Sequence, residues 1–305
     1  MERAPRTGGI PAREDSGEQA TRTPEATAAP APFAVPRRLF EVDSTNRYLV
    51  DLCAAGLEDG LAVPDGYAVI AERQTAGRGR LGRRWEAPEA SSVLCSILLL
   101  HDLAPDQLHL LTWAVALAAA DACEEVARVD VTLKWPNDLL VGDRKIAGLL
   151  AEVVPPVPGA PTTPDGAPGP PTPGGAVVVG IGINVNWPTG WPRTDRSDPE
   201  LERIASLGTA LNRLVGREID RDSLVERLLP ATGNWSARAR TAEGRRALTT
   251  SYRRRSSTIG RAVRVELAGE TFVGQALDVD DAGCLLVESD ANLRTVSAGD
   301  VVHLR

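Results

Sequence analysis

Lysine is almost absent from this chain of 305 residues. Only Lys134 and Lys145 occur, against 32 arginines. A bias toward arginine usually reflects coding composition. The compact ammonium of lysine and the planar guanidinium of arginine are not interchangeable. Lys134 and Lys145 lie only 11 positions apart, which favours a site that needs an ammonium group. The alternative is that the two lysines are close together by chance.

Cysteine and histidine are also scarce. The four cysteines are Cys53, Cys95, Cys123 and Cys284. Their spacing matches neither a metal site nor a disulfide framework, which favours reduced thiols in a cytoplasmic protein. Three histidines, in apolar or terminal contexts, form no Ser-His-Asp arrangement and no zinc cluster. These absences disfavour nucleophilic catalysis and favour catalysis by positioning and charge stabilisation.

Long apolar runs and single-sign charge are missing as well. The apolar run 108–123 is interrupted by polar residues and is too short to cross a bilayer. No basic start followed by an apolar stretch marks a secretory signal. Thirty-four basic and 41 acidic residues give a net charge of −7, so the chain lacks the broad basic field of nucleic-acid binders. We expect a cytoplasmic protein that binds neither membrane nor nucleic acid.

The length predicts about two domains. Residues 1–36 have almost no large apolar side chains and are expected to be a disordered tail without a helix-turn-helix. Helical and strand patterns mix over 37–255, predicting an α/β (α+β) catalytic domain with a mixed sheet and helices at 47–52, 108–126, 200–215 and 220–240. Five short β-rich runs over 256–305 predict a small C-terminal β-barrel, resembling a Src-homology-3 barrel.

One segment inside the first domain breaks the pattern. Residues 155–175 contain nine prolines and five glycines. This composition is typical of a flexible insertion. Because strands are expected on both sides, the segment is predicted to be a long disordered loop between them, not a domain boundary.

A glycine-rich loop over 77–82 fits the pattern G-x-G-x-x-G. A strand precedes it, but no helix follows, so the dinucleotide-binding interpretation fails. Arg78, Arg80, Arg83 and Arg84 offer forked donors for phosphate or carboxylate, and the glycines allow the backbone to approach a ligand. The loop suits a polyanionic small ligand. A solvated basic turn is the alternative.

The segment 134–138 (KWPND) follows a predicted strand. Pro136 ends that strand and leaves Asn137 and Asp138 at its end. A lysine, an amide and a carboxylate so close together can hold phosphates and a metal ion. A polar turn is the alternative. Lys145 lies just past the tip of the following hairpin, so both lysines can face one pocket.

Two further segments carry polar side chains beside apolar patterns. In the run 176–186 (AVVVGIGINVN), one face by period two is apolar and the other carries Gly180, Gly182, Asn184 and Asn186. Bare glycines in a strand often mark a ligand. Residues 43–46 (DSTN) suit a helix cap or the recognition of a small polar head group.

Taken together, these segments resemble the biotin–protein ligase family over about residues 38–305. The resemblance rests on the segments STN at 44–46, ERQ at 72–74, GRGRLGRRW at 77–85, KWPNDL at 134–139, K-x-AG at 145–148 and GIGINVN at 180–186, in the order of the family. It implies a two-step ATP-dependent ligase. Biotin and magnesium-ATP form biotinyl-5'-adenylate, which then acylates a lysine of a biotin carboxyl carrier domain.

The resemblance also implies residue roles. The biotin-binding residues would be Ser44, Thr45, Asn46, Gln74, Arg78, Gly79, Arg80, Lys145, Gly180 and Gly182. The ATP-binding residues would be Arg80, Arg83, Trp85, Lys134, Asn137, Asp138, Asn184 and Asn186. The catalytic residues would be Lys145, Arg80 and Lys134, and the magnesium ligands Asp138 and Asn186. Lys145 is the residue expected to offset the repulsion between carboxylate and phosphate.

Three other functions were weighed. A lipoate or octanoyl transferase shares the catalytic architecture, but the arginine loop and KWPND favour biotin. A biotin-dependent regulator is disfavoured because the sequence shows no DNA-binding module. A non-catalytic protein with a degenerate site is disfavoured because the Arg, Lys, Asn and Asp side chains of the site are all present. Family members dimerise by varied routes, so a homodimer is left open.

Overall fold

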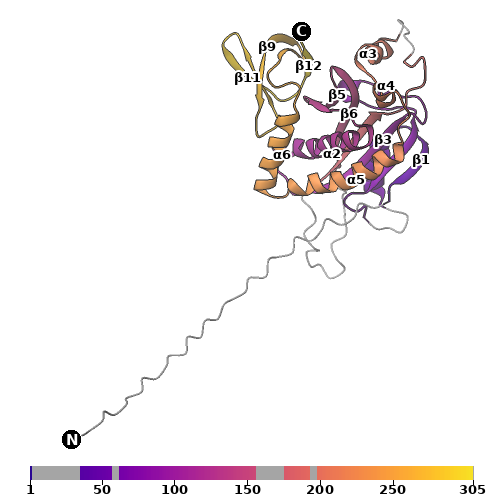
Figure 1. The fold of residues 1–305 in the computed structure, drawn as a ribbon, viewed down its shortest axis with the longest axis horizontal. Coiled ribbons are helices and arrows are strands. Elements are labelled where there is room, and N and C mark those ends of the chain that lie inside the picture. The colour runs from indigo at the N-terminus through magenta and orange to yellow at the C-terminus, as the bar shows by residue number, and fades with distance from the viewer. Residues whose placement is uncertain (2–34, 57–61, 156–174, 193–197, 305) are drawn as a thin grey trace.

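The structure, a computed structural model, describes residues 1, 35–56, 62–155, 175–192 and 198–304. Two sheets and a layer of helices make up the described part (Figure 1). Almost all of the predicted tail 1–36 and of the predicted loop 155–175 lies outside the described residues.

The larger sheet has seven strands in the order β1-β2-β3-β7-β6-β5-β4. Their bounds are Arg37–Val42 (β1), Ala68–Gln74 (β2), Ser92–His101 (β3), Thr132–Lys134 (β4), Asp138–Val141 (β5), Arg144–Val153 (β6) and Gly175–Asn184 (β7). Strands β1 and β2 run parallel and every other pair is antiparallel, which confirms the predicted mixed sheet. The proline-rich segment joins β6 to its neighbour β7, where Val153 pairs with Val177.

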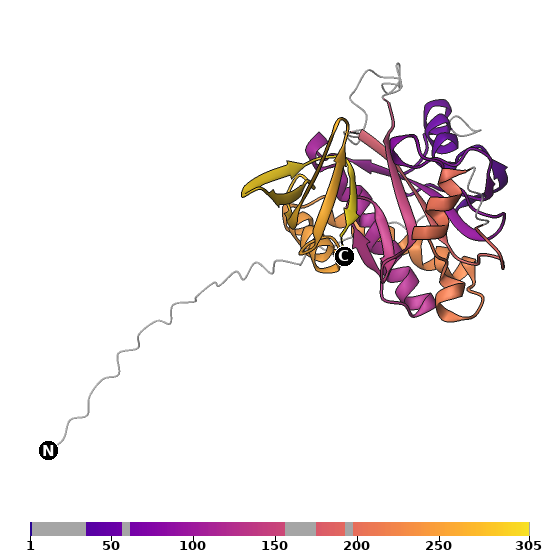
Figure 2. The same ribbon diagram turned by 90° about the horizontal axis from the view of Figure 1, so that it is seen from above.

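Helices cover both faces of this sheet (Figures 1 and 2). Helix α2 (His109–Ala127) packs on one face beside α5 (Arg221–Arg238) and α6 (Ala242–Arg255). Because α2 is apolar on nearly every side, it suits an internal position. Helix α1 (Thr45–Ala55) covers the other face, where Leu49 packs with Val69, Leu98 and Val178.

The C-terminal unit is a five-stranded antiparallel sheet in the order β11-β10-β9-β8-β12. The strands are Ala262–Leu267 (β8), Glu270–Val279 (β9), Leu285–Ser289 (β10), Asn292–Val296 (β11) and Asp300–His303 (β12). The five predicted strands are confirmed. In the described ladders β11 and β12 are the two edges, with no pairing between them. Val263, Val265 and Val287 share one core with α2, so the two sheets pack together.

Three elements differ from expectation. The single helix predicted over 200–215 is α3 (Pro199–Leu207) and α4 (Leu211–Val215), divided at Gly208, where a Cβ would meet Ile204 O at 2.8 Å. Strand β1 was not predicted, because its alternating pattern is short and arginine-rich. Helix α6 was not predicted, because its buried face is narrow. Short 3-10 turns also occur at Arg80–Gly82 and Pro105–Gln107.

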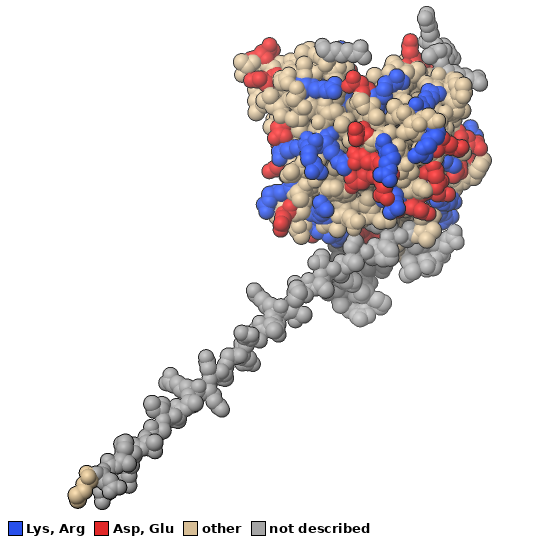
Figure 3. All heavy atoms as spheres, viewed as in Figure 1, with Lys and Arg blue, Asp and Glu red and all other residues tan. Residues whose placement is uncertain are grey.

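Charged side chains are interspersed by sign on the face drawn in Figure 3. Arg255 of α6 pairs with Asp121 and Glu124 of α2 at 2.7 and 2.8 Å. None of the described helices combines the length and apolar character needed to cross a membrane.

Candidate active site

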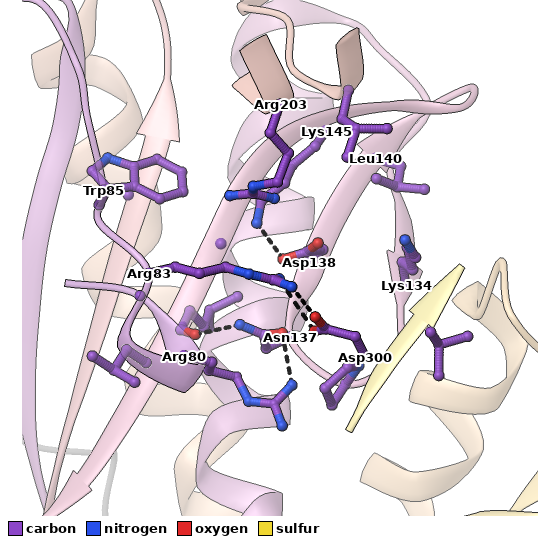
Figure 4. A pocket seen from close by; sticks show the side chains of 18 of the residues that line it. Arg80, Arg83, Trp85, Lys134, Asn137, Asp138, Leu140, Lys145, Arg203 and Asp300 are labelled. Atoms are coloured by element: carbon purple, nitrogen blue, oxygen red, sulfur yellow. Dashed lines mark hydrogen bonds and ion pairs between the residues drawn. The ribbon is translucent and has the colours of Figure 1, made fainter. Parts of the chain in front are cut away.

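A cavity of about 480 Å³ opens between the larger sheet and the C-terminal sheet. Its walls come from the glycine-rich loop, the β4–β5 turn, β6, β7, α3 and strands β8 and β12 (Figure 4). Ten basic side chains line it: Arg78, Arg80, Arg83, Arg84, Lys134, Arg144, Lys145, Arg203, Arg261 and Arg264. The acidic ones are Asp138, Asp143, Glu266 and Asp300. The lining is therefore basic in a protein that is acidic as a whole.

One end of the cavity is lined by neutral polar side chains. Gln74 Oε1 accepts from Thr45 N at 2.8 Å and from Thr45 Oγ1 at 3.1 Å. Asn46 Nδ2 donates to Leu150 O at 3.0 Å and to Glu152 Oε2 at 2.9 Å. Gly180 is bare because a Cβ there would overlap Asn46 Oδ1. The lining side chains Thr45, Asn46 and Gln74 are neutral donors and acceptors that suit a neutral polar head group, with the Glu152 carboxylate behind them.

Ser44 belongs to the same end. It occupies the N-cap position of α1, but its side chain makes no capping hydrogen bond. Ser44 therefore occupies the predicted N-cap position, but its side chain lines the cavity and does not cap the helix.

Trp85 lies on two glycines that face each other across β6 and β7. Gly148 and Gly182 are paired in the ladder, and a Cβ on Gly182 would overlap the indole of Trp85. Lys145 Nζ stands 5.6 Å from the centre of that ring, within cation–π range. The glycines therefore make room for an aromatic wall beside an ammonium.

Lys145 pairs with Asp138 across the hairpin of β5 and β6, at 2.5 Å between Nζ and Oδ1. Lys134 lies at the end of β4, directly opposite Asp138 in the ladder. Burial and the nearby charges of Lys145, Arg203 and Arg83 lower the pKa of Lys134, although Asp138 opposes the shift. In the described part of the chain, Lys134 has no carboxylate within ion-pair distance. An anion entering here would relieve the crowding of cations.

Arg80 approaches the same region from the glycine-rich loop. Its Nη1 lies 3.4 Å from Asn137 Oδ1 and 3.4 Å from Gly299 O. Burial lowers the pKa of Arg80, with Asp138 opposing and Arg83 adding to the shift, yet a guanidinium stays charged at neutral pH. Asn137 in turn donates to Leu149 O at 2.6 Å, which fixes the turn that carries it.

The arginines of the loop are tied to three separate elements. Arg78 pairs with Glu152 of β6 at 2.6 Å, Arg83 with Asp300 of β12, and Arg84 with Asp198 before α3 at 2.8 Å. The loop is thus held by carboxylates at its rim.

Most of the predicted site residues meet in this cavity. Its lining contains Ser44, Thr45, Asn46, Gln74, Arg78, Gly79, Arg80, Arg83, Trp85, Lys134, Asn137, Asp138, Lys145, Gly180 and Gly182. Asn184 and Asn186 are not among them. Asn184 donates to Thr209 O at 3.1 Å and lines a smaller neighbouring depression. Asn186 exchanges two hydrogen bonds with the backbone of Ile219. The placement of Asn186 therefore does not support its predicted role as a magnesium ligand.

The comparisons with known proteins agree with this geometry. The Biotin/lipoate A/B protein ligase family matches residues 42–160, and the Biotin protein ligase C terminal domain matches residues 258–304. A biotin–[acetyl-CoA-carboxylase] ligase of Mycobacterium tuberculosis is 36% identical over 87% of each chain. This chain belongs to the biotin protein ligase family.

Two more relatives extend the comparison. The bifunctional ligase/repressor BirA of Bacillus subtilis is 29% identical over 78% of this ligase and 66% of its own length. A solved structure of the biotin protein ligase of Aquifex aeolicus, in complex with biotin and ATP, has a TM-score of 0.65 and 26% identity. It covers 90% of this ligase and 100% of that chain, so the two share one architecture from the first sheet to the last.

Several lining residues of this biotin protein ligase were not predicted. Arg203 comes from α3, Arg264 and Asp300 come from the C-terminal sheet, and Arg261 directly precedes that sheet's strand β8. Nothing in their local sequence sets them apart from an ordinary solvated face. Their charge is the one feature that could have indicated a role in the site. Arginine is so common in this chain that charge does not distinguish these residues from the others.

Proposed function

We propose that this biotin protein ligase carries out both of its steps in the single cavity described above, and that its two lysines act there on the reacting anions. The observation that carries the proposal is the convergence of Lys134 and Lys145, the chain's only ammonium side chains, on one end of the cavity. The neutral cluster around Asn46 forms another part of the same cavity. A ligand with an uncharged polar head and a carboxylate tail fits this division.

In the proposed biotin site, Ser44, Thr45, Asn46 and Gln74 bind the urea ring of biotin, whose carbonyl accepts and whose N–H groups donate hydrogen bonds. The bare backbone at Gly180 lets the ring lie close to β7. The glycine-rich loop, with Arg78, Gly79 and Arg80, covers the bound molecule.

In the proposed adenylation step, a carboxylate oxygen of biotin attacks the α-phosphorus of ATP. The new carboxylate–phosphorus bond forms as the bond from that phosphorus to the β-phosphate oxygen breaks, and pyrophosphate leaves. Two anions must approach each other, so cations placed beforehand lower the barrier. Lys145 faces both reacting groups once its contact with Asp138 is exchanged for them, and Lys134, Arg80 and Arg83 bind phosphate oxygens.

In the proposed transfer step, the amine of an acceptor lysine attacks the acyl carbon of biotinyl-5'-adenylate. An amide bond forms, the bond from the acyl carbon to the phosphate oxygen breaks, AMP leaves, and the amine loses a proton. We propose a biotin carboxyl carrier domain as the acceptor. The relative from M. tuberculosis supports this, because it is named for acetyl-CoA carboxylase.

Magnesium is proposed to accompany ATP. In the described residues no group of three or more His, Cys, Asp or Glu side chains forms a protein-only metal site. That fits magnesium, which commonly takes one or two carboxylates and otherwise phosphates and water. Asp138 is the carboxylate that would hold the ion, and Asn137 adds an amide oxygen. The ion would add charge neutralisation at the phosphates.

The test is pyrophosphate release from magnesium-ATP, measured with biotin and, separately, with lipoate. Release with biotin alone is the expected result. Release with lipoate alone would show that the neutral side chains around Asn46 bind lipoate and not biotin. Lipoate is the alternative substrate to test because the matching family includes lipoate ligases. No release with either, from folded protein, would contradict adenylation.

A further inference from the structure

Helix α3 is held at both ends by residues of the site. Asp198 caps its N-terminus and pairs with Arg84 of the glycine-rich loop at 2.8 Å. At its C-terminal end, Gly208 forms a bridge with Lys145, and Thr209 N donates to Lys145 O at 2.9 Å. The helix therefore spans from the loop to the strand that carries Lys145, and its middle lies over the cavity.

Arg203 lies in the middle of that helix, and its side chain points into the cavity (Figure 4). Within the described residues its ion pair is with Glu200, on the same helix, at 2.5 Å. The contact is bidentate, with Nε and Nη2 of Arg203 donating to the two carboxylate oxygens of Glu200 at 3.2 and 2.5 Å. Among the described residues Nη1 of Arg203 has no hydrogen-bond partner, so this side of the guanidinium is available to an anion in the cavity.

The cations around Arg203 exceed what one phosphate group needs. The positive charges of Lys145, Arg203 and Arg83 all reach Lys134 and lower its pKa. Three of these four cations have a carboxylate partner: Asp138 for Lys145, Asp300 for Arg83 and Glu200 for Arg203. Among the described residues, Lys134 and Arg80 of the same lining have no carboxylate within ion-pair distance. An acyl-adenylate carries a single phosphate, whereas ATP brings two further phosphate groups. The excess of cations matches the outer phosphates of ATP.

We propose that Arg203 is a binding residue for the β- and γ-phosphates of ATP, and hence for the pyrophosphate that leaves. The proposal rests on the proposed function. A guanidinium offers two parallel donors to phosphate oxygens. Arg203 then acts whenever ATP or pyrophosphate is in the site, during adenylation and its reversal. Arg203 has no phosphate to bind when biotinyl-5'-adenylate is the only ligand in the site, because the adenylate lacks the β- and γ-phosphates.

The experiment compares wild type with Arg203→Ala in three assays. The KM for magnesium-ATP in pyrophosphate release should rise on the order of tenfold or more, the scale of losing a charge-assisted hydrogen bond. The KM for pyrophosphate, in ATP formation from synthetic biotinyl-5'-adenylate, should rise similarly. The Kd of biotinyl-5'-adenylate itself should change less than about twofold. Arg203→Lys should recover part of the loss, because it keeps the charge but not the fork.

A matched control is Arg227→Ala on α5, where an exposed arginine pairs with Glu125 at 3.1 Å outside the cavity lining. It should leave all three quantities unchanged. Equal weakening of adenylate binding in Arg203→Ala would overturn the proposal, because α3 would then act only as a cover. Unchanged KM values would overturn it too.

The two proposals fail separately. If wild-type protein releases no pyrophosphate, the proposed function is wrong. The role of Arg203 is then tested by calorimetric titration with magnesium-ATP alone. Wild type should bind ATP more tightly than Arg203→Ala. Equal affinities would refute the inference.

Discussion

In the proposed adenylation step Lys145 faces both reacting anions, and its ion pair with Asp138 orients the ammonium beforehand. We expect Lys145→Ala to lower the rate of adenylation on the order of a hundredfold or more, the scale of losing one preorganised charge. Pyrophosphate release at saturating biotin and ATP measures this. Turnover close to that of wild type would remove Lys145 from the mechanism.

The bare backbone at Gly180 makes a second prediction for a single residue. A methyl group there would overlap Asn46 Oδ1, so Gly180→Ala should displace the amide and weaken biotin binding by about tenfold, the loss of roughly one hydrogen bond in a closed site. Calorimetric titration with biotin measures the Kd. Gly274→Ala on β9 is the control for steric overlap alone, because a Cβ there would overlap Glu288 O outside the cavity lining.

At the scale of elements, a chain of hydrogen bonds joins the β4–β5 turn to the C-terminal sheet. Trp135 N donates to Thr258 Oγ1 at 3.0 Å, and that hydroxyl lies 3.0 Å from His303 Nε2. Which of Thr258 and His303 donates in this contact depends on the tautomer of the imidazole. Burial, then Lys134 and Arg261, lower the pKa of His303 from 6.5 to about 4.

The sign of the resulting pH dependence follows. Between about pH 6.5 and 4, the unfolded chain takes up a proton at His303 that the folded chain excludes, so stability falls as the pH is lowered through this window. His303→Gln keeps an acceptor for Thr258 and should flatten that part of the profile. Urea unfolding at several pH values measures it. Parallel profiles for wild type and variant would contradict the prediction.

Sequence patterns predict elements well where burial is continuous. Strand β3 and the apolar helix α2 are both buried along most of their length, so a continuous apolar composition is enough to mark such elements. Strand β1 and helix α6 escape prediction because each buries only a few side chains. Period-two alternation also misleads beyond a strand's end. Strand β7 ends at Asn184, so Asn186 turns away from the face on which the alternation placed it.

The site divides in the same way. Local segments rich in glycine, arginine and amides identify the loop, the β4–β5 turn and β7. Arg203 and Asp300 reach the cavity only because α3 and the C-terminal sheet close on it. Such contacts depend on tertiary packing, and no spacing in the sequence encodes them.

At the scale of the whole molecule, a basic cavity lies within an acidic protein. The lining has ten basic against four acidic side chains, while the chain carries −7. Salt weakens such fields. Between about 50 and 300 mM salt we expect the KM for ATP to rise several-fold, and the KM for biotin, whose head is neutral, to rise less. An equal rise in KM for both substrates would show that the basic lining does not attract ATP electrostatically.

The scarcity of lysine has a consequence for the protein's own surface. Acyl-adenylates acylate amines but not guanidinium groups. Both lysine amines of this chain line the cavity, and the remaining basic side chains outside it are arginines. An activated biotin that escapes therefore finds no lysine on the exterior of the molecule that made it. The lysine side chains that such a molecule could label on the ligase are confined to the cavity.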